Sequence, residues 1–263
     1  MDEVSMNPTQ PQEIPALSIP RVVVSVKALT DFVIGVDALV DEALIEVNPD
    51  GINVMAMDPS SVSMVKAFMP LAVKSNFKFG VDVPALKKIL VAIDSNKDEG
   101  DLELTLKDDK KIILTYKDTV AELNTIDVKK SVQKEPKVDF NTKFYPNAKA
   151  FRDGLKLMDK VSSYVTLSSE ADSQKLKLYA KGDSGTLMTM MQAEIYSVRE
   201  GNTAVPNTTY NLEFLTKMVK ASSLSKDKEQ KIALHINHNE PILISYKIAD
   251  LSLSYWLAPY LEE

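Results

Sequence analysis

The stretch Leu104–Lys117, LTLKDDKKIILTYK, aligns without gaps on Leu234–Lys247, LHINHNEPILISYK, at an offset of 130 residues. Both copies end in strands of nearly the same text, ILTYK and LISYK. The match continues in the same alternating phase, since Ala121 falls on Leu251 at the same offset. Any two hairpins share some pattern, but agreement over this length and phase favours an internal duplication over chance.

The same order of elements is predicted around each copy. Leu29, Phe32 and Val33 recur at helical spacing, and Pro84 marks the first turn of a second helix. The NPDG turn of Asn48–Gly51 predicts a β-hairpin between these two helices. We expect helices over residues 27–40, 83–93, 148–161 and 211–221, and strands over residues 43–47, 52–57, 62–68, 76–81, 101–106, 112–117, 120–126, 164–167, 176–180, 185–191, 232–236, 242–247 and 251–256. The predicted fold class is α+β, with two similar domains, each of two helices packed on antiparallel sheets.

Composition along the chain suggests where these domains begin and end. Residues 1–20 hold four of the 13 prolines and few bulky apolar residues, which is typical of a flexible tail. Residues 128–138 are rich in lysine and contain Pro136, so they read as a connector. We therefore expect a tail over residues 1–20, a first domain over 21–127, the connector over 128–138, and a second domain over 139–263.

Charge and cysteine content exclude several classes of protein. The 263 residues carry 31 Lys and Arg against 37 Asp and Glu, a net charge of −6. This balance argues against a protein that coats nucleic acid with its whole surface, but not against a local basic patch. Cysteine is absent, which excludes disulfides, thiol catalysis and cysteine-ligated metals. There is no apolar run of membrane-spanning length and no secretory signal, so we expect an intracellular protein, cytoplasmic in a prokaryote or nuclear in a eukaryote.

The sequence lacks the motifs of common enzymes. It has no glycine-rich phosphate loop and no G-x-S-x-G nucleophile elbow. His235 and His238 are the only histidines, and we expect both to be exposed to solvent and not to bind a metal. A carboxylate- or metal-dependent hydrolase is the alternative from another class, but it would need converging Asp and Glu ligands. We therefore expect no enzyme activity, no catalytic residue, no metal and no cofactor.

Cations gather on the polar faces of the predicted helices. Lys149, Arg152, Lys156 and Lys160 fall within about 80° of arc on one helix, opposite apolar residues such as Phe151. Two further helices carry cations off their apolar stripes, namely Lys217, Lys220, Lys87 and Lys88. An ordinary solvated face would look the same. The alternative is a surface that follows phosphates, and the excess of lysine over arginine favours loose contacts over base recognition.

Three short motifs, in this order, resemble a known family. Met57–Val62, MDPSSV, follows a predicted hairpin, Pro241–Lys247 continues into IAD, and Trp256–Pro259 reads WLAP near the C-terminus. Their order, the duplicated architecture and the central connector resemble the PCNA-type DNA sliding clamps over about residues 21–263. The resemblance implies a ring of three subunits whose helices line a hole around duplex DNA. It also implies binding of polymerases, nucleases, ligases and a clamp loader through short peptides that contain a glutamine and apolar or aromatic anchors.

The resemblance assigns residues to three surfaces. The partner-peptide groove would use Met57, Val62, Val132, Val138, Pro241, Trp256, Leu257, Ala258 and Pro259, whereas Met57, Val62 and Leu257 could equally be core residues. The DNA-facing set would be Lys27, Lys87, Lys88, Lys149, Arg152, Lys156, Lys160, Lys217 and Lys220. The subunit interface would pair residues 120–126 with 185–191 of a neighbouring subunit, through Ala121, Leu123, Leu187 and Met188.

The sequence departs from the family pattern at the hole. The first helix carries Thr30, Asp31 and Asp37 at positions where relatives often have cations, and only Lys27 remains. Acidic residues also occur on the later helices, at Asp153 and Glu213. Three readings stay open: a homotrimer with a looser grip on DNA, one subunit of a heterotrimer whose partners supply charge, and a checkpoint-type clamp.

Overall fold

The structure is a computed structural model that describes residues 19–95, 100–128, 134–140, 142–169, 173–197 and 205–261. Most of the predicted tail lies outside these described residues, and so does Val132 of the predicted connector.

The described chain contains the same order of elements twice, one strand, a helix, four strands, a helix and three strands. The first half consists of β1 (Arg21–Ser25), α1 (Val26–Asp37), β2 (Glu42–Asn48), β3 (Gly51–Met57), β4 (Ser63–Pro70), β5 (Phe77–Asp82), α2 (Val83–Asp94), β6 (Asp101–Lys107), β7 (Lys111–Tyr116) and β8 (Thr119–Asn124). The second half consists of β9 (Thr142–Pro146), α3 (Ala148–Met158), β10 (Tyr164–Ser169), β11 (Lys175–Gly182), β12 (Gly185–Ser197), β13 (Val205–Asn211), α4 (Leu212–Lys220) with the short 3₁₀ helix η1 (Ala221–Leu224), β14 (Ala233–Ile236), β15 (Ile242–Ile248) and β16 (Leu251–Leu257). This order confirms the predicted α+β class.

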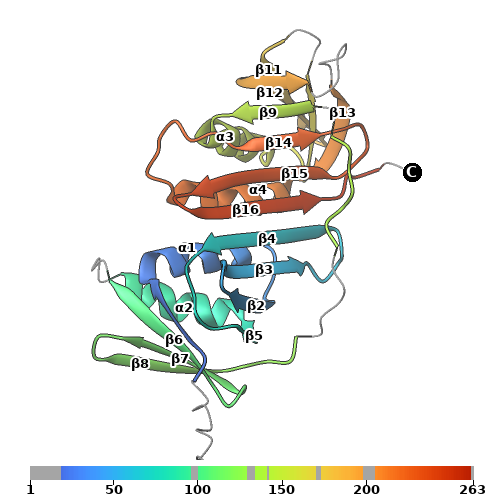
Figure 1. Cartoon of the computed structure of the whole chain (residues 1–263). Helices are drawn as coiled ribbons and strands as arrows, with labels where there is room; N and C mark the ends of the chain where they lie inside the picture. The colour runs from blue at the N-terminus through green and yellow to red at the C-terminus, as the bar shows by residue number, and fades with distance from the viewer. Residues whose placement is uncertain are drawn as a thin grey trace, which may run out of the picture.

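The strands pair in blocks of four that correspond between the halves (Figure 1). A four-stranded sheet has the order β1-β6-β7-β8, and its counterpart in the second half is β9-β14-β15-β16. The block β5-β2-β3-β4 likewise corresponds to β13-β10-β11-β12. Three of these blocks join into one twelve-stranded antiparallel sheet, because β12 pairs with β9 and β16 pairs with β4.

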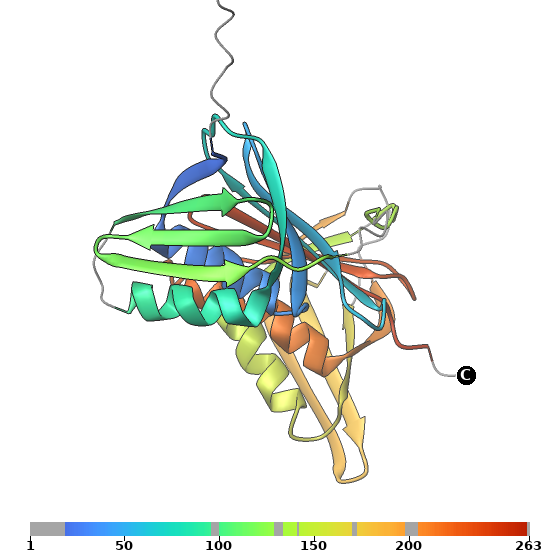
Figure 2. The ribbon, with the colours of Figure 1, turned by 90° about the horizontal axis from the view of Figure 1, so that it is seen from below.

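All four helices begin in the same way. A side chain at each N-terminus accepts a hydrogen bond from a backbone N–H of the first turn, which satisfies one of the donors that a helix leaves open. For α2 the Asp82 carboxylate accepts from Ala85 N at 2.8 Å, and Pro84 lies in the first turn. The capping residues of the other helices are Ser25, Asn147 and Asn211. The helices lie along one side of the molecule and pack in pairs, α1 with α2 and α3 with α4 (Figure 2).

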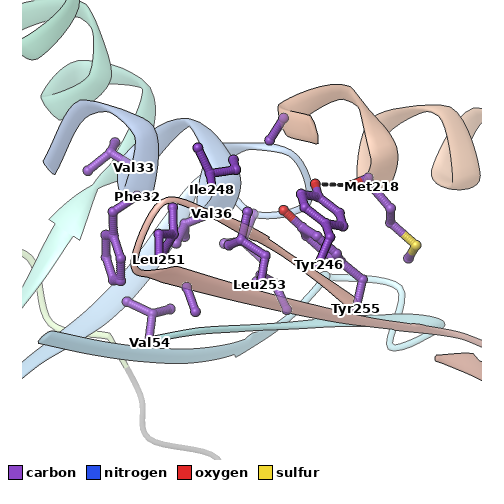
Figure 3. Close-up of a cluster of buried hydrophobic side chains, with 14 of the residues drawn as sticks. Phe32, Val33, Val36, Val54, Met218, Tyr246, Ile248, Leu251, Leu253 and Tyr255 are labelled. Atoms are coloured by element: carbon purple, nitrogen blue, oxygen red, sulfur yellow. Dashed lines mark hydrogen bonds between the residues drawn. The ribbon is translucent and has the colours of Figure 1, made fainter. Parts of the chain in front are cut away.

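The two halves meet across β4 and β16 and share a continuous core (Figure 3). On the helix side of this junction Phe32 and Val36 of α1 lie against Leu251 and Leu253 of β16. A Cβ atom at Gly35 would come within 2.7 Å of Leu253 Cδ2, so glycine allows α1 to approach β16 this closely. The buried residues of the two halves therefore form one core across the junction.

Two buried tyrosines of β15 and β16 add hydrogen bonds at the junction. The Tyr255 hydroxyl donates to the carbonyl of Gly35 in α1 at 2.9 Å, a bond from the second half to the first. The Tyr246 hydroxyl donates to Met218 O of α4 at 2.6 Å (Figure 3). Burial raises the pKa of both phenols, so each keeps its proton and remains a donor.

The prediction missed three strands and extended two helices too far. The missed strands are β1, β9 and β13. The first two have five residues each and run directly into a helix, so their alternation is short. The helix predicted over 27–40 ends at Asp37, and the one predicted over 148–161 ends at Met158. No helix in the described parts of the chain is both long and apolar enough to cross a membrane.

Candidate functional site

The loop between β3 and β4 is fixed by a buried carboxylate. Asp58 accepts hydrogen bonds from the backbone N–H and the hydroxyl of both Ser60 and Ser63. Burial alone would raise the pKa of Asp58, but these bonds outweigh it and lower the pKa below its ordinary value. The network holds Met57 and Val62 at the two ends of the loop, where Val62 is 38% exposed and Met57 is half-buried. For Val62 the structure rules out a core position.

Trp256 lies on the outer face of the sheet, which we define as the face opposite the helices. Side chains alternate along β16, and Leu251, Leu253 and Tyr255 face the helices. Trp256 therefore points outward, where it pairs in register with Met64 of β4. Both side chains are buried, at 5% and 1% exposure, and neither belongs to the core on the helix side. An apolar floor thus crosses the junction on the outer face. Met64 was not among the predicted groove residues, although its spacing from Lys66 and Phe68 places it on this face.

The alternation corrects the expectation for Leu257. Its side chain is 1% exposed and belongs to the core on the helix side, so the groove cannot use it. The C-terminal segment leaves β16 along the strand edge, where Ala258 N donates to Val62 O at 2.9 Å. The other expected groove residues, Pro241, Ala258, Pro259 and Val138, are each half-buried.

The described end of the connector lies on the same outer face. Lys66 of β4 forms an ion pair with Glu135, and Asn237 Nδ2 donates to Asp139 O at 2.9 Å. Phe140 packs edge-on against His235, with ring centroids 5.3 Å apart. Residues from both halves therefore anchor the connector close to Trp256.

His235 is not exposed as expected. It is half-buried beneath Phe140, and burial together with the nearby Lys143 lowers its pKa from 6.5 to about 4. His238 is exposed. Among the described residues, no three His, Cys, Asp or Glu side chains lie close enough to hold a metal ion.

The helices present cations that are mostly paired with acids on the same surface. Asp153 of α3 lies 2.6 Å from Lys149 Nζ and 3.6 Å from Lys156 Nζ. On α4 Lys217 lies 2.6 Å from Glu213. Because all of these side chains are well exposed, each pair is weak and exchangeable.

The first two helices differ from this pattern. Lys27 Nζ lies 2.5 Å from Asp31, a largely buried carboxylate whose pKa burial raises. Lys87 of α2 lies 2.5 Å from Asp37 of α1. Thr30 is buried and donates to Val26 O at 2.7 Å, so it does not face the solvent as the resemblance implied.

Other expected cations have varied surroundings. Arg152 is half-buried and bonds to the hydroxyl of Ser222, so it is tied to the turn that follows α4. Lys160 lies beyond the end of α3 and is exposed, as are Lys88 and Lys220. Within the described parts of the chain, these three lysines have no carboxylate partner.

Among the strand edges that lack a strand partner in the described residues, those of β8 and β12 lie at opposite ends of the molecule (Figure 1). β8 is the last strand of the four-stranded sheet and pairs only with β7. β12 pairs with β11 over 185–192 and with β9 over 193–197, so the second edge of 185–192 is open. Of the expected interface residues, Met188 is 54% exposed, while Ala121, Leu123 and Leu187 are half-buried against the core. Two further exposed residues were not among the predicted contacts. Met190 lies in the same row of β12 as Met188, and Val120 lies in the exposed row of β8 that also holds Glu122.

Comparison with known proteins gives consistent matches. The family model described as proliferating cell nuclear antigen, C-terminal domain, matches residues 134–260. A protein of Methanococcus vannielii named DNA polymerase sliding clamp is 32% identical over 237 residues, covering 85% of this chain and 92% of that protein. A protein of Methanothrix thermoacetophila with the same name is 29% identical over 259 residues, covering 92% and 99%.

Solved structures show the same fold. A structure titled C-terminal region of FEN-1 bound to A. fulgidus PCNA has a TM-score of 0.78 at 20% identity, covering 92% of this chain and 99% of that one. The PCNA of Thermococcus kodakaraensis has a TM-score of 0.77 at 20% identity, covering 91% and 99%.

Proposed function

The chain belongs to the family of PCNA-type DNA polymerase sliding clamps, and from that premise we propose that three copies close into a ring around duplex DNA. Such a ring would tether polymerases, nucleases and ligases to their template, and it would itself be no enzyme. The domains would be residues 21–127 and 139–263, joined by the connector 128–138, with residues 1–20 as a tail.

The observation that carries the proposal is the ladder between β16 and β4. In the duplicated architecture β8 is the counterpart of β16, and β12 is the counterpart of β4. The pair β16–β4 joins the two halves inside one chain, whereas β8 and β12 keep open edges. Pairing β8 of one copy with β12 of the next would repeat the internal junction and cover both edges.

The side chains on the two edges fit such a contact between identical chains. Exposed apolar side chains on both strands, Val120, Met188 and Met190, would be buried when the edges pair. These features support a homotrimer over the mixed-ring alternative, since one chain supplies both complementary edges.

The helices would line the hole and meet the DNA backbone. They lie together on one side of the molecule, away from the outer face, and carry lysines without base-reading groups (Figure 2). Lysine forms loose, salt-sensitive contacts with phosphate, as sliding requires.

The outer face would receive partner peptides. The floor formed by Trp256 and Met64 lies beside Met57, Val62 and the anchored connector. An apolar groove of this kind accepts a helical turn with apolar or aromatic anchors. The fold-level match to a clamp with a nuclease segment bound is consistent with this role.

The ring is tested by mass and by a matched pair of edge variants. Light scattering should give three times 29.2 kDa for the wild type. Val120→Lys on β8 should lower the mass to that of a monomer, because a charge would enter the paired edge. Val23→Lys on β1, the opposite edge of the same sheet with similar exposure, should leave the trimer intact. A monomeric wild type that trimerises only with other chains would favour the mixed ring, and a monomer under all conditions would overturn both.

Encirclement is tested by blocking DNA ends. A ring threads onto a linear duplex only through a free end, whereas a surface binder needs none. Wild-type protein should associate with a linear duplex that has free ends and lose this association when bulky groups block both ends. Equal binding to both duplexes would contradict encirclement.

The groove is tested with an exposed residue, because truncation of the buried Trp256 would also disturb folding. Val62→Lys should abolish binding of a peptide with a glutamine and an aromatic pair, measured by fluorescence anisotropy. Val23→Lys is again the matched control and should bind the peptide normally. Normal peptide binding by Val62→Lys would place the groove elsewhere.

A further inference from the structure

The carboxylates on α3 and α4 contribute little to folding, because Asp153 lies in the middle of α3 and Glu213, in the first turn of α4, adds only a small favourable interaction with the helix dipole. Asp153 and Glu213 have side-chain exposures of 47% and 72%, and neither caps a helix or reaches another element in the described structure. Each holds a lysine one turn away on its own helix. Such i,i+4 pairs add little to stability in water.

These carboxylates occupy the surface that would face DNA phosphates. Asp153 lies between Lys149 and Lys156, so one acid engages two of the lysines on the exposed face of α3. The hydrogen bond and charge of Lys149 lower the pKa of Asp153, which keeps it ionised. A phosphate that approaches Lys149 or Lys156 must therefore displace the Asp153 carboxylate and is also repelled by its charge.

The pairs of the first half behave differently. Asp31 is largely buried and keeps Lys27 close to α1, and Asp37 keeps Lys87 between α1 and α2. Separating Lys27 from Asp31 would leave a charge unpaired at a largely buried site, which is costly. Exchangeable lysines are thus concentrated on the second half, on α3 and α4.

Resting on the proposed function, we propose that Asp153 and Glu213 act as built-in counter-ions that compete with DNA phosphates and set a weak grip on the duplex. Their ligand is the phosphate backbone of duplex DNA, and their effect is to weaken each lysine contact. Removing them should tighten DNA binding, mainly through the second half of each subunit.

The test uses two charge-matched double variants of the full chain. Asp153→Asn with Glu213→Gln removes both counter-ions from the helices. Glu103→Gln with Glu194→Gln removes two acids of the strands β6 and β12, whose basic partners Arg21 and Lys231 lie outside the helices, with the same change in net charge. Duplex affinity is measured by anisotropy over a salt series, and thermal melting checks the fold.

The helix variant should bind a free-ended duplex about eightfold more tightly than the wild type, at about twofold for each of the three ion pairs that DNA must break. Its dependence of affinity on salt should also be steeper, because more lysines release counter-ions from DNA. The sheet variant should match the wild type within about twofold.

The outcomes separate this inference from the proposed function. If the wild type binds free-ended duplex and the helix variant binds no more tightly than the sheet variant, the counter-ion role is wrong and the clamp function stands. If both double variants tighten binding equally, net charge alone is the cause, and the inference is again wrong. If neither wild type nor variants bind duplex even at low salt, both the inference and the proposed function are overturned.

Discussion

Replacing Tyr255 by phenylalanine should loosen the junction between the two halves. The phenol is fully buried, and its hydroxyl donates to Gly35 O at 2.9 Å. Gly35 lies in the last turn of α1, whose carbonyls lack partners within the helix. The substitution keeps the ring and removes the hydroxyl, which also contacts the Tyr246 hydroxyl, so the buried carbonyl of Gly35 is left unsatisfied.

The expected cost follows from that carbonyl. An unsatisfied buried acceptor costs about 1–3 kcal/mol, and we expect about 2 kcal/mol for Tyr255→Phe. This corresponds to a roughly 30-fold larger unfolding constant. For a chain of this size the melting temperature should fall by about 4–8 °C at equal protein concentration.

Hydrogen exchange locates the effect. Tyr255→Phe should speed exchange of backbone amides in α1 and at the β4–β16 ladder. Tyr210→Phe is the matched control, because that buried hydroxyl donates to Glu240 O at 3.0 Å inside the second half. It should destabilise the protein without selective exposure of α1.

Two results would refute this reasoning. One is a loss of stability below about 0.5 kcal/mol, which would mean that water or a shifted helix satisfies the carbonyl. The other is the same exchange pattern in both variants, which would mean that the Tyr255 bond does not join the halves.

Three further predictions concern the connector, pH and the DNA-facing helices. In Gly80→Ala the new Cβ would lie 2.2 Å from Ile126 O, so the start of the connector should detach. Protease cleavage within residues 128–138 should then become faster. Gly100→Ala is the control, because its new Cβ would meet only the Tyr116 side chain, at 3.0 Å, and cleavage should not change. Folding lowers the pKa of His235 from 6.5 to about 4. Between these two pH values the unfolded chain has His235 protonated and the folded chain does not, so the free energy of unfolding should fall as the pH drops from 6.5 to about 4. His235→Gln should flatten that part of the stability curve in denaturant titrations, and an unchanged slope would assign it to other groups. Lys156→Ala with Lys220→Ala should weaken duplex binding and reduce its salt dependence without altering circular dichroism; unaffected polymerase stimulation at moderate salt would show that these lysines are not contacts.

Much of the fold could be predicted because alternation and helical spacing are local. The repeated text near Leu104 and Leu234 established two equivalent halves before any contact was known. β13 could not be found in this way, since its residues VPNTTYN are mostly polar and include a proline. Its pairing with β10 comes from the tertiary fold and not from its own pattern.

The site was less predictable because family motifs give residue identity without side-chain direction. The motif around Trp256 and Leu257 suggested that both face a groove, yet adjacent residues of a strand point to opposite faces. Counting from Leu253, which faces the core, would have placed Leu257 inside and Trp256 outside. The ion pair between Lys149 and Asp153 can be predicted, because residues four apart on a helix are neighbours. The ion pair between Lys87 and Asp37 joins two helices and depends on how they pack.

The ladder between β4 and β16 also decides how the chain comes apart. Each half covers an edge strand of the other along residues 63–68 and 252–257. If one half unfolded alone, the half that stayed folded would expose an open strand edge and the part of its core at the junction, which includes Leu253 in the second half. Independent melting is therefore unfavourable for both halves, and they form one cooperative unit although the sequence repeats the same unit twice. A calorimetric scan should accordingly show a single transition, in which the duplicated halves lose their structure together.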